Sequence, residues 1–195
     1  CLERVKRELR ALVDVLRTAN ANEVSGALQM ARGLRDVTSC DDAVALARPV
    51  PPPSKGPDVE KVRAAYETLA DAKARDIAGR WSEVQALAAT VEGAARAVDY
   101  KPLLGEALLA QGRVKLHERD EKEAARLLRQ AVLASQAGRD DERVIEEMTL
   151  LVQVEGELAE RPEHADLWRD LAQSQLERIG GDAQLESNLT FAHGL

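Results

Sequence analysis

Few side chains in this sequence have the types and spacing that catalysis or metal binding requires. The chain has three histidines and two cysteines among its 195 residues. His117 and Glu121 stand four residues apart, which brings two possible metal ligands to one face of a helix. They lie in a polar stretch typical of a solvated helix end, and His164 and His193 have no histidine or cysteine within a helical turn. We therefore predict no metal site and no cofactor.

The sequence also lacks the motifs of phosphoryl-transfer enzymes. The 34 acidic residues are spread along the whole chain, so no pair stands out as a general acid and base. There is no glycine-rich phosphate loop, and His117-Glu118-Arg119-Asp120 is not followed by the asparagine of a kinase catalytic loop. We expect this chain not to be an enzyme, and we predict no catalytic residue.

The two cysteines suggest a covalent link at the start of the chain. Helices predicted over residues 1–19 and 23–34 form an antiparallel hairpin that turns at residues 20–22. This hairpin places Cys1 opposite Cys40, and a disulfide between them implies an oxidising compartment. Two unrelated free thiols are the alternative, and the sequence leaves both open. A bridge closing a loop of this size contributes roughly 3–4 kcal/mol in the chain-entropy treatment.

Residues 1–48 are predicted to form this helical hairpin followed by a short helix over residues 43–47. Apolar residues at helical spacing define the faces expected to be buried. The first helix buries Leu2, Val5, Leu9, Leu12, Val13 and Leu16, and the second buries Val24, Ala27, Leu28 and Ala31. Residues 49–57 contain four prolines between positions 49 and 53, so we predict an extended, stiff linker there.

Residues 58–195 are predicted to consist of repeated helix pairs. Residues 102–137 show two apolar stripes separated by a polar turn, and Gly138 is expected to end the second helix in the left-handed conformation. The same pattern divides the rest of the region into units at 58–98 and 140–179 and a half unit at 182–195. Equivalent positions recur about 40 residues apart: Val84, Ala88 and Val91, then Ala124, Leu128 and Ala131, then Ala165, Arg169 and Ala172.

Two resemblances follow from these residues. Gly112 with Ala124, Leu128 and Ala131 resembles the small-residue skeleton of a tetratricopeptide (TPR) repeat, and Gly79-Arg80-Trp81 resembles its turn signature. This resemblance implies an all-α fold, an α-α superhelix of TPR-like hairpins preceded by an N-terminal helical hairpin.

The order of segments along nearly the whole chain resembles a more specific family. It is similar to the region C-terminal to the catalytic domain in TPR-containing bacterial serine/threonine protein kinases. The segments are CLERVKRELRALVDVL (1–16), TSCDDAVALARPVPPP (38–53), GRW (79–81), DYKPLLGEALLAQGR (99–113), AGRDD (137–141) and ERIGGD (177–182). In that family a membrane helix separates the kinase from this region, which implies a soluble extracytoplasmic sensor. A cytoplasmic location is expected if Cys1 and Cys40 are unbridged.

The TPR resemblance also predicts which residues face a partner. The first helix of each repeat lines the concave face in such arrays. Lys73 and Arg113 occupy equivalent positions, so they are expected either to hold an acidic group of a peptide or to be ordinary solvated residues. Trp81 and Trp168 are expected to be packing anchors. The predicted partner-binding residues are Tyr66, Leu69, Lys73 and Ile77, then Glu106, Leu109, Arg113 and His117, then Glu147, Leu150, Val154 and Leu158.

Composition limits the kind of partner. A net charge of −7 and a pI near 5.1 argue against nucleic acid, which favours a basic surface. No apolar run approaches the roughly 20 residues that span a bilayer, so contact with a membrane is expected only through the parent protein. We predict a protein- or peptide-binding scaffold. The alternatives are a small-molecule sensor and a spacer that self-associates through residues 182–195.

Overall fold

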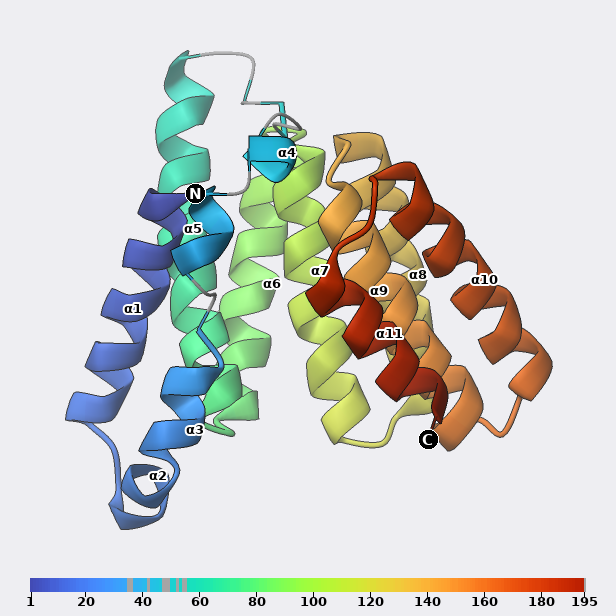
Figure 1. The fold of residues 1–195 in the computed structure, drawn as a ribbon. Helices are drawn as coiled ribbons and strands as arrows, with labels where there is room; N and C mark the ends of the chain where they lie inside the picture. The colour runs from blue at the N-terminus through green and yellow to red at the C-terminus, as the bar shows by residue number, and fades with distance from the viewer. Residues whose placement is uncertain (35–36, 42, 47–49, 52, 54–55, 195) are drawn as a thin grey trace.

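The structure, a computed structural model, describes residues 1–34, 37–41, 43–46, 50–51, 53 and 56–194 (Figure 1). Parts of the predicted 43–47 helix and of the 49–57 linker lie outside these residues. The described chain is all-helical and contains no strand, which confirms the all-α part of the predicted fold class. The long helices are α1 (Leu2–Arg17), α5 (Gly56–Ile77), α6 (Trp81–Ala97), α7 (Lys101–His117), α8 (Glu121–Gly138), α9 (Asp141–Gln153), α10 (Pro162–Arg178) and α11 (Ala183–Gly194).

Shorter elements complete the chain. They are α2 (Ala21–Ser25), α3 (Ala27–Arg32), a 3-10 turn at Val37–Asp41, α4 (Ala43–Leu46), and a π-helical turn at Val154–Leu158 that continues α9. The long helices begin and end within a few residues of their predicted bounds, because the turn residues and apolar stripes mark these positions clearly.

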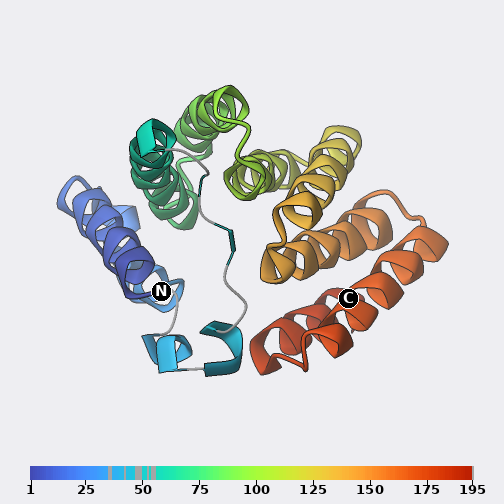
Figure 2. The ribbon, with the colours of Figure 1, turned by 90° about the horizontal axis from the view of Figure 1, so that it is seen from above.

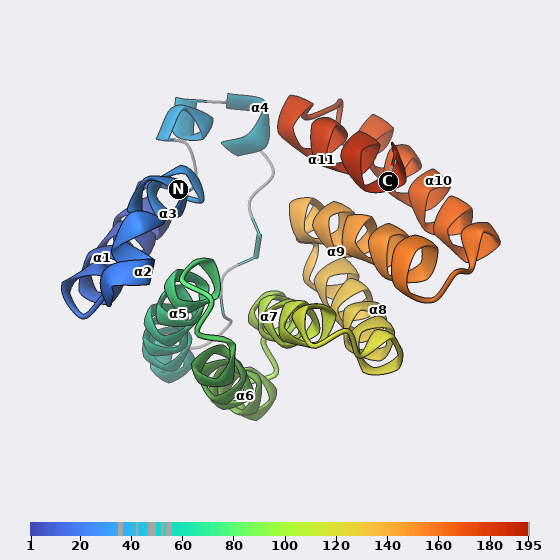
Figure 3. The ribbon, with the colours of Figure 1, turned by 90° about the horizontal axis from the view of Figure 1, so that it is seen from below.

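The long helices follow one another around an arc (Figures 2 and 3). An inner row consists of α1, α5, α7, α9 and α11, in which each helix contacts the next, and α6, α8 and α10 lie on the outside. The 3-10 turn and α4 lie at the open side of the arc, between α1 and α11 in these views. The inner row therefore brings side chains far apart in sequence onto one surface.

Small residues set the distance between α7 and α8. A Cβ atom added at Gly112 would lie 2.9 Å from the Leu128 side chain, closer than real contacts allow. Ala124, Leu128 and Ala131 are fully buried, as are Val84, Ala88 and Val91 in α6. The expectation that these residues lie at helix–helix contacts is confirmed.

The end of α8 differs from its predicted form. Gly138 is the last helical residue, and Arg139 adopts the left-handed conformation with φ of 59°. Gly138 is required for another reason, since its Cβ would lie 2.8 Å from the backbone nitrogen of Pro102 at the start of α7. The Asp140 side chain then accepts a hydrogen bond from the Arg143 amide and caps α9.

The N-terminal hairpin was only partly predicted. The second helix is broken into α2 and α3 near Gly26, and α1 packs mainly against α5 through its Ala11, Leu12 and Val15 face. Of the residues expected to be buried there, six are exposed: Leu2, Leu9, Val13, Val24, Leu28 and Ala31. The apolar stripe of α1 is wider than the face that one neighbouring helix covers, and the packing on α5 uses a different part of it.

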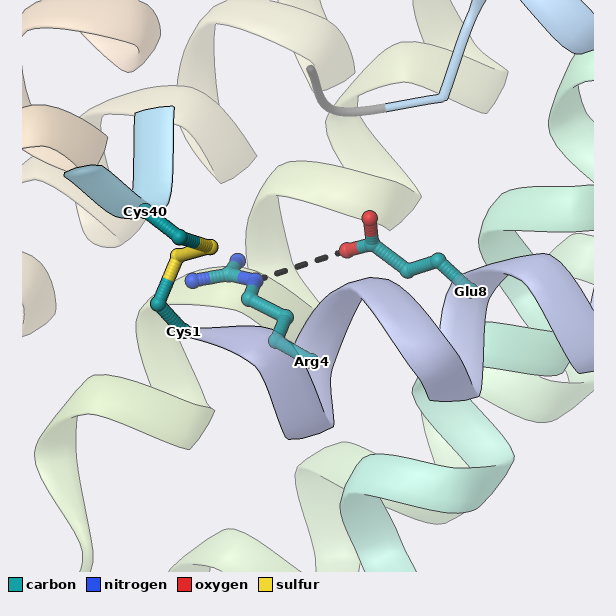
Figure 4. Close-up of a disulfide and its surroundings, with 4 residues drawn as sticks. All are labelled: Cys1, Arg4, Glu8 and Cys40. Atoms are coloured by element: carbon teal, nitrogen blue, oxygen red, sulfur yellow. Dashed lines mark hydrogen bonds and ion pairs between the residues drawn. A yellow bond between two sulfur atoms is a disulfide. The ribbon is translucent and has the colours of Figure 1, made fainter. Parts of the chain in front are cut away.

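The structure contains the first of the two alternatives for Cys1 and Cys40, the disulfide. The structure joins the two side chains in a disulfide with their Cα atoms 5.6 Å apart. Figure 4 shows this bond beside Arg4 and Glu8 on the first turns of α1. The bond fixes the segment around the 3-10 turn to the N-terminus of α1.

The close approach of α7 and α8 gives a matched test. Gly112→Ala is expected to destabilise the fold by about 1–3 kcal/mol, because the new methyl group overlaps Leu128. Gly93→Ala in α6 meets nothing within 4 Å and is expected to stabilise the fold by about 0.5–1 kcal/mol through helix propensity. Urea denaturation measures both. Equal effects from the two substitutions would show that α8 does not lie against Gly112.

Candidate binding surface

The inner row contains a buried carboxylate that neighbouring helices neutralise. Glu106 on α7 is only 2% exposed. Its Oε2 accepts hydrogen bonds from Arg4 Nη2 of α1 at 2.6 Å and from Lys73 Nζ of α5 at 2.7 Å. Burial alone would raise the pKa of Glu106, but the positive charges of Arg4, Lys73 and Arg143 hold it below its ordinary value. Glu106 therefore stays ionised and connects three inner helices.

The same type of ion pair recurs one unit further along. Arg113 of α7 reaches Glu146 of α9, with Nη2 and Oε1 2.5 Å apart. Arg113 lies 40 residues after Lys73, and Glu146 lies 40 residues after Glu106. Arg143 also pairs with Glu146, and the two arginines hold the pKa of Glu146 at about 2 although its burial acts in the opposite direction. Each cation therefore binds an acid of the next inner helix.

The series does not continue at the third position. The equivalent residues are Gln153 at the end of α9 and Glu186 on α11. Gln153 carries no charge, and the exposed Glu186 forms no ion pair within the described part of the chain. The pattern of cation–acid pairs between successive inner helices thus stops before α11.

The predicted partner-binding residues separate into two groups. Five of them are at most 4% exposed, so a partner cannot reach them in this arrangement: Leu69, Glu106, Leu109, Glu147 and Val154. Predicting these five as partner-binding residues overestimated how open this face is, because neighbouring helices cover them. The partly or well exposed members are Tyr66, Lys73, Ile77, Arg113, His117, Leu150 and Leu158.

Of these exposed residues, His117 belongs to an aromatic stack, and Arg113 faces the same carboxylate as His117. The rings of Trp81 and His117 are 4.4 Å apart and nearly parallel, and Trp81 remains 39% exposed. His117 Nε2 lies 3.8 Å from a carboxylate oxygen of Asp76, which also faces Arg113. Trp81 is thus a partly exposed residue that packs on His117, whereas Trp168 packs partly buried against the core.

Tyr66 on α5 and Tyr100 before α7 both pack against the main hydrophobic core. The Tyr100 hydroxyl donates to the carbonyl oxygen of Pro51 at 2.9 Å. Arg7 lies over the Tyr66 ring, with its guanidinium carbon 5.5 Å from the ring centre. Burial raises the pKa of both tyrosines, so both hydroxyls keep their protons at neutral pH.

Sequence reasoning missed several residues of this surface. Arg4 and Glu8 were assigned to a separate hairpin, and Tyr100 and Pro51 were treated as turn and linker. Their hydrophilic or turn-forming character gives no signal of long-range contact. The 40-residue offset between Glu106 and Glu146 is present in the sequence, and it would have predicted the acidic partners of Lys73 and Arg113.

Glu147 is a second buried carboxylate, in a very different environment. Its side chain is fully buried, Oε1 accepts a hydrogen bond from Ser135 Oγ at 2.7 Å, and Oε2 has no hydrogen-bond partner. Burial raises the pKa of Glu147 well above its ordinary value, while the Ser135 hydrogen bond acts in the opposite direction. The side chain therefore favours the neutral acid, and it serves α8–α9 packing.

A third buried carboxylate marks the π-helical turn. Glu155 is 1% exposed and pairs with Arg161 at 2.8 Å and Arg129 at 3.2 Å, with His164 Nδ1 3.6 Å away. These cations come from α8 and from the start of α10. The arrangement fixes the turn between α9 and α10, and sequence reasoning did not identify it.

Cavities on this face are small or polar. One pocket of about 10 Å³ lies between α1 and α5 and is lined by Arg4, Tyr66 and Lys73 among others. A second, of about 190 Å³, is lined mainly by charged side chains such as Arg7, Arg10 and Asp71. Small-molecule sites usually enclose about 300–1,000 Å³ with mostly apolar walls. Neither pocket has both properties.

Comparisons with known proteins leave the family open. No protein-family model, curated protein or solved structure matches the chain. The likeness to TPR-containing kinase regions thus stays a prediction. No helix among the described residues is long and apolar enough to cross a bilayer. The described residues also contain no cluster of three histidine, cysteine, aspartate or glutamate side chains suited to a metal ion.

Glu106 gives the first prediction from this surface. Glu106→Gln leaves Arg4 and Lys73 with only the longer Glu8 contacts at 3.4 Å and 3.6 Å, and it is expected to cost about 3 kcal/mol of unfolding free energy at pH 7. Because the pKa of Glu106 is lower in the folded state, this difference should shrink as pH falls below the ordinary glutamate value of about 4.3. Urea denaturation measures it.

Glu60→Gln is the control, since Glu60 pairs with Arg63 on the surface, where ion pairs contribute at most about 1 kcal/mol. Similar losses for Glu60→Gln and Glu106→Gln would contradict the linking role of Glu106.

Glu147 leads to the opposite prediction. Its raised pKa means that the folded state binds the proton more tightly, so its stabilising contribution is complete below about pH 4.3 and declines as pH rises. Glu147→Gln imitates the neutral acid and should be more stable than the wild type at pH 8. The expected gain is about 1.4 kcal/mol for each pKa unit between the ordinary glutamate value and the folded-state value, counted up to pH 8. The gain should vanish near pH 4. A gain that does not depend on pH would contradict a neutral Glu147.

Proposed function

We propose that this chain is a TPR-like superhelix that binds a protein or peptide, as the sensor or docking region of a bacterial serine/threonine kinase. The observation that carries the proposal is the inner row of helices. On this surface, ion pairs recur with the same 40-residue offset as the small residues that pack the helices. Repeated helix pairs that share one curved surface are typical of peptide-binding solenoids.

The shape of this surface favours a peptide or protein over a small molecule. The two pockets at α1 and α5 are too small or too polar for a typical metabolite site. By contrast, Arg113, His117 and Trp81 offer exposed cationic and aromatic groups at one end of α7. Aromatic and arginine side chains are those that contribute most at protein interfaces. The small-molecule sensor thus remains the weaker alternative.

The disulfide supports an extracytoplasmic location. Stable disulfides occur mainly in oxidising compartments, and Cys1–Cys40 is bridged in the structure. This agrees with the proposed parent, in which a membrane helix separates the kinase from this region. In this proposal, contact with the membrane occurs only through that parent protein.

Self-association is a second candidate, favoured by the exposed apolar residues at the C-terminal end. Phe191 of α11 is 69% exposed and Leu167 of α10 is 56% exposed. Solenoid ends usually carry polar caps, and apolar ends favour contact with another surface. Sedimentation velocity over a range of concentrations distinguishes a self-associating spacer from a monomeric scaffold.

A peptide-array screen tests the scaffold. The intact chain should bind a subset of extended peptides, and Arg113→Ala should weaken the strongest of these at least 5-fold, because Arg113 lies on the inner row. Lys122→Ala, an exposed cation on the outer helix α8, should change affinity less than 2-fold. Absence of any peptide or protein ligand, together with turnover of a substrate, would overturn the proposal.

A further inference from the structure

Two buried polar atoms on α9 have no hydrogen-bond partner and lie one helical turn apart. Arg143 and Glu147 are 8% and 0% exposed. They stand four residues apart, which places their side chains on one face of the helix. The Nε of Arg143 and the Oε2 of Glu147 each have no hydrogen-bond partner within the described part of the chain. Buried polar atoms are nearly always paired, so this unused donor and acceptor require an explanation.

Each of the two side chains is held by another neighbour. Arg143 uses Nη1 to bind Glu146, the residue next to Glu147. Glu147 Oε1 shares a hydrogen bond with Ser135 Oγ of α8 at 2.7 Å. Ser135 is itself enclosed, since a Cβ atom at Gly105 of α7 would lie 2.1 Å from its Oγ. The Glu147 carboxyl is therefore fixed between α8 and α9, and the longer Arg143 side chain is the one that can turn.

The charges around Glu147 make Arg143 its natural partner. The negative charges of Glu146 and Asp140 disfavour ionisation of Glu147, whereas the positive charge of Arg143 favours it. Burial has the largest effect and raises the pKa of Glu147 well above its ordinary value. Glu147 is thus neutral in conditions where surface glutamates are charged, and a neutral carboxyl attracts Arg143 only weakly.

The charged residues on the elements that pack against α9 have partners of their own or face solvent. On α11, Glu186 is exposed. The paired residues are Glu106 of α7 with Lys73, Arg129 of α8 with Glu155 of the π-helical turn, and Arg178 of α10 with Asp141.

Glu146 connects this buried pair to the exposed Arg113. Its Oε1 lies 2.5 Å from Arg113 Nη2, and its Oε2 binds Arg143 Nη1. The two arginines share one carboxylate, so departure of one leaves the whole charge to the other. The Arg113 side chain is 38% exposed and belongs to the surface proposed to bind peptides. A change at Glu147 can therefore reach this surface through Arg143 and Glu146.

We propose that Glu147 is a proton-controlled switch that sets how tightly Glu146 holds Arg113. When Glu147 releases its proton to solvent, Arg143 turns its unused Nε to Oε2 and leaves Glu146, which then binds Arg113 alone. When Glu147 takes up a proton, Arg143 returns to Glu146, and Arg113 is freer to bind an acidic group of a peptide. This regulation rests on the proposed scaffold function, because it acts on a residue of that surface.

The experiment follows the side chains by NMR in the intact chain without a ligand. With isotope-labelled arginine and glutamate, it records the Nε–H signals of Arg143 and Arg113 and the carboxyl signal of Glu147. The range from about pH 5 to about pH 9 covers the raised pKa values of buried glutamates. Glu147→Gln is the variant that cannot switch. Glu163→Gln, at an exposed acid of α10, is the control.

In the wild type and the control, both arginine signals should shift with the same midpoint as the Glu147 carboxyl signal. In Glu147→Gln the shift at this midpoint should be absent from both. At the high end of the range, the Arg143 Nε–H should exchange with water about 10-fold more slowly in the wild type than in Glu147→Gln, because a hydrogen bond to a charged acceptor must open first. Any titration of His117, which faces Asp76 together with Arg113, should be the same in all three proteins.

A Glu147 carboxyl that titrates without moving the Arg143 signal would overturn the proposal, and so would one that keeps a single state over the whole range. Movement of Arg143 without Arg113 would disprove the link to the surface. These outcomes are read from the wild type, so they do not depend on the folding of a variant. Because no peptide is present, they leave the scaffold function standing, which fails only if the array screen finds no ligand.

Discussion

The arrangement of the inner helices depends on the burial of one negative charge. Removing a carboxylate from water costs several kcal/mol unless cations and hydrogen bonds compensate it. Glu106 obtains this compensation from Arg4 on α1 and Lys73 on α5, which are distant from it in sequence. Since α1 has only a small buried face of Ala11, Leu12 and Val15, the ion pairs and the Cys1–Cys40 bond decide where it lies. The N-terminal helix is therefore part of the array.

Helix packing along the arc sets the separations that the ion pairs of the inner row then span. Small residues such as Gly112 and Ala124 let paired helices approach closely, and this sets the separation of successive inner helices. That separation in turn allows a long cation on one inner helix to reach an acid on the next, as Lys73 and Arg113 do. The Lys73–Glu106 and Arg113–Glu146 pairs share the 40-residue offset that separates Val84, Ala88 and Val91 from Ala124, Leu128 and Ala131.

Local signals in the sequence predicted the long helices well, because turn residues and apolar stripes determine their ends. The same local signals predicted the buried charges and contacts of the inner surface poorly. The buried carboxylates Glu106, Glu147 and Glu155 look like ordinary surface acids in the sequence, since only tertiary contacts reveal whether a charge is covered. Likewise, α1 has an apolar stripe wide enough for two different packings, and the stripe alone does not choose between them. Hairpin geometry identified Cys1 and Cys40 as a candidate pair, although the sequence left a disulfide and two free thiols as alternatives.

The two ends of the inner row differ in a way that bears on how the surface is used. At the N-terminal end, α1 supplies Arg4 to Glu106 and closes the row. At the C-terminal end, Gln153 replaces the expected cation, Glu186 is exposed, and Phe191 on the same helix is largely exposed. The described part of the chain thus places an exposed acid and an exposed apolar ring on the same last helix of the row. Contacts that extend the array are therefore expected at α11, whereas peptide ligands are expected near α5 and α7, so the two uses of the surface are compatible.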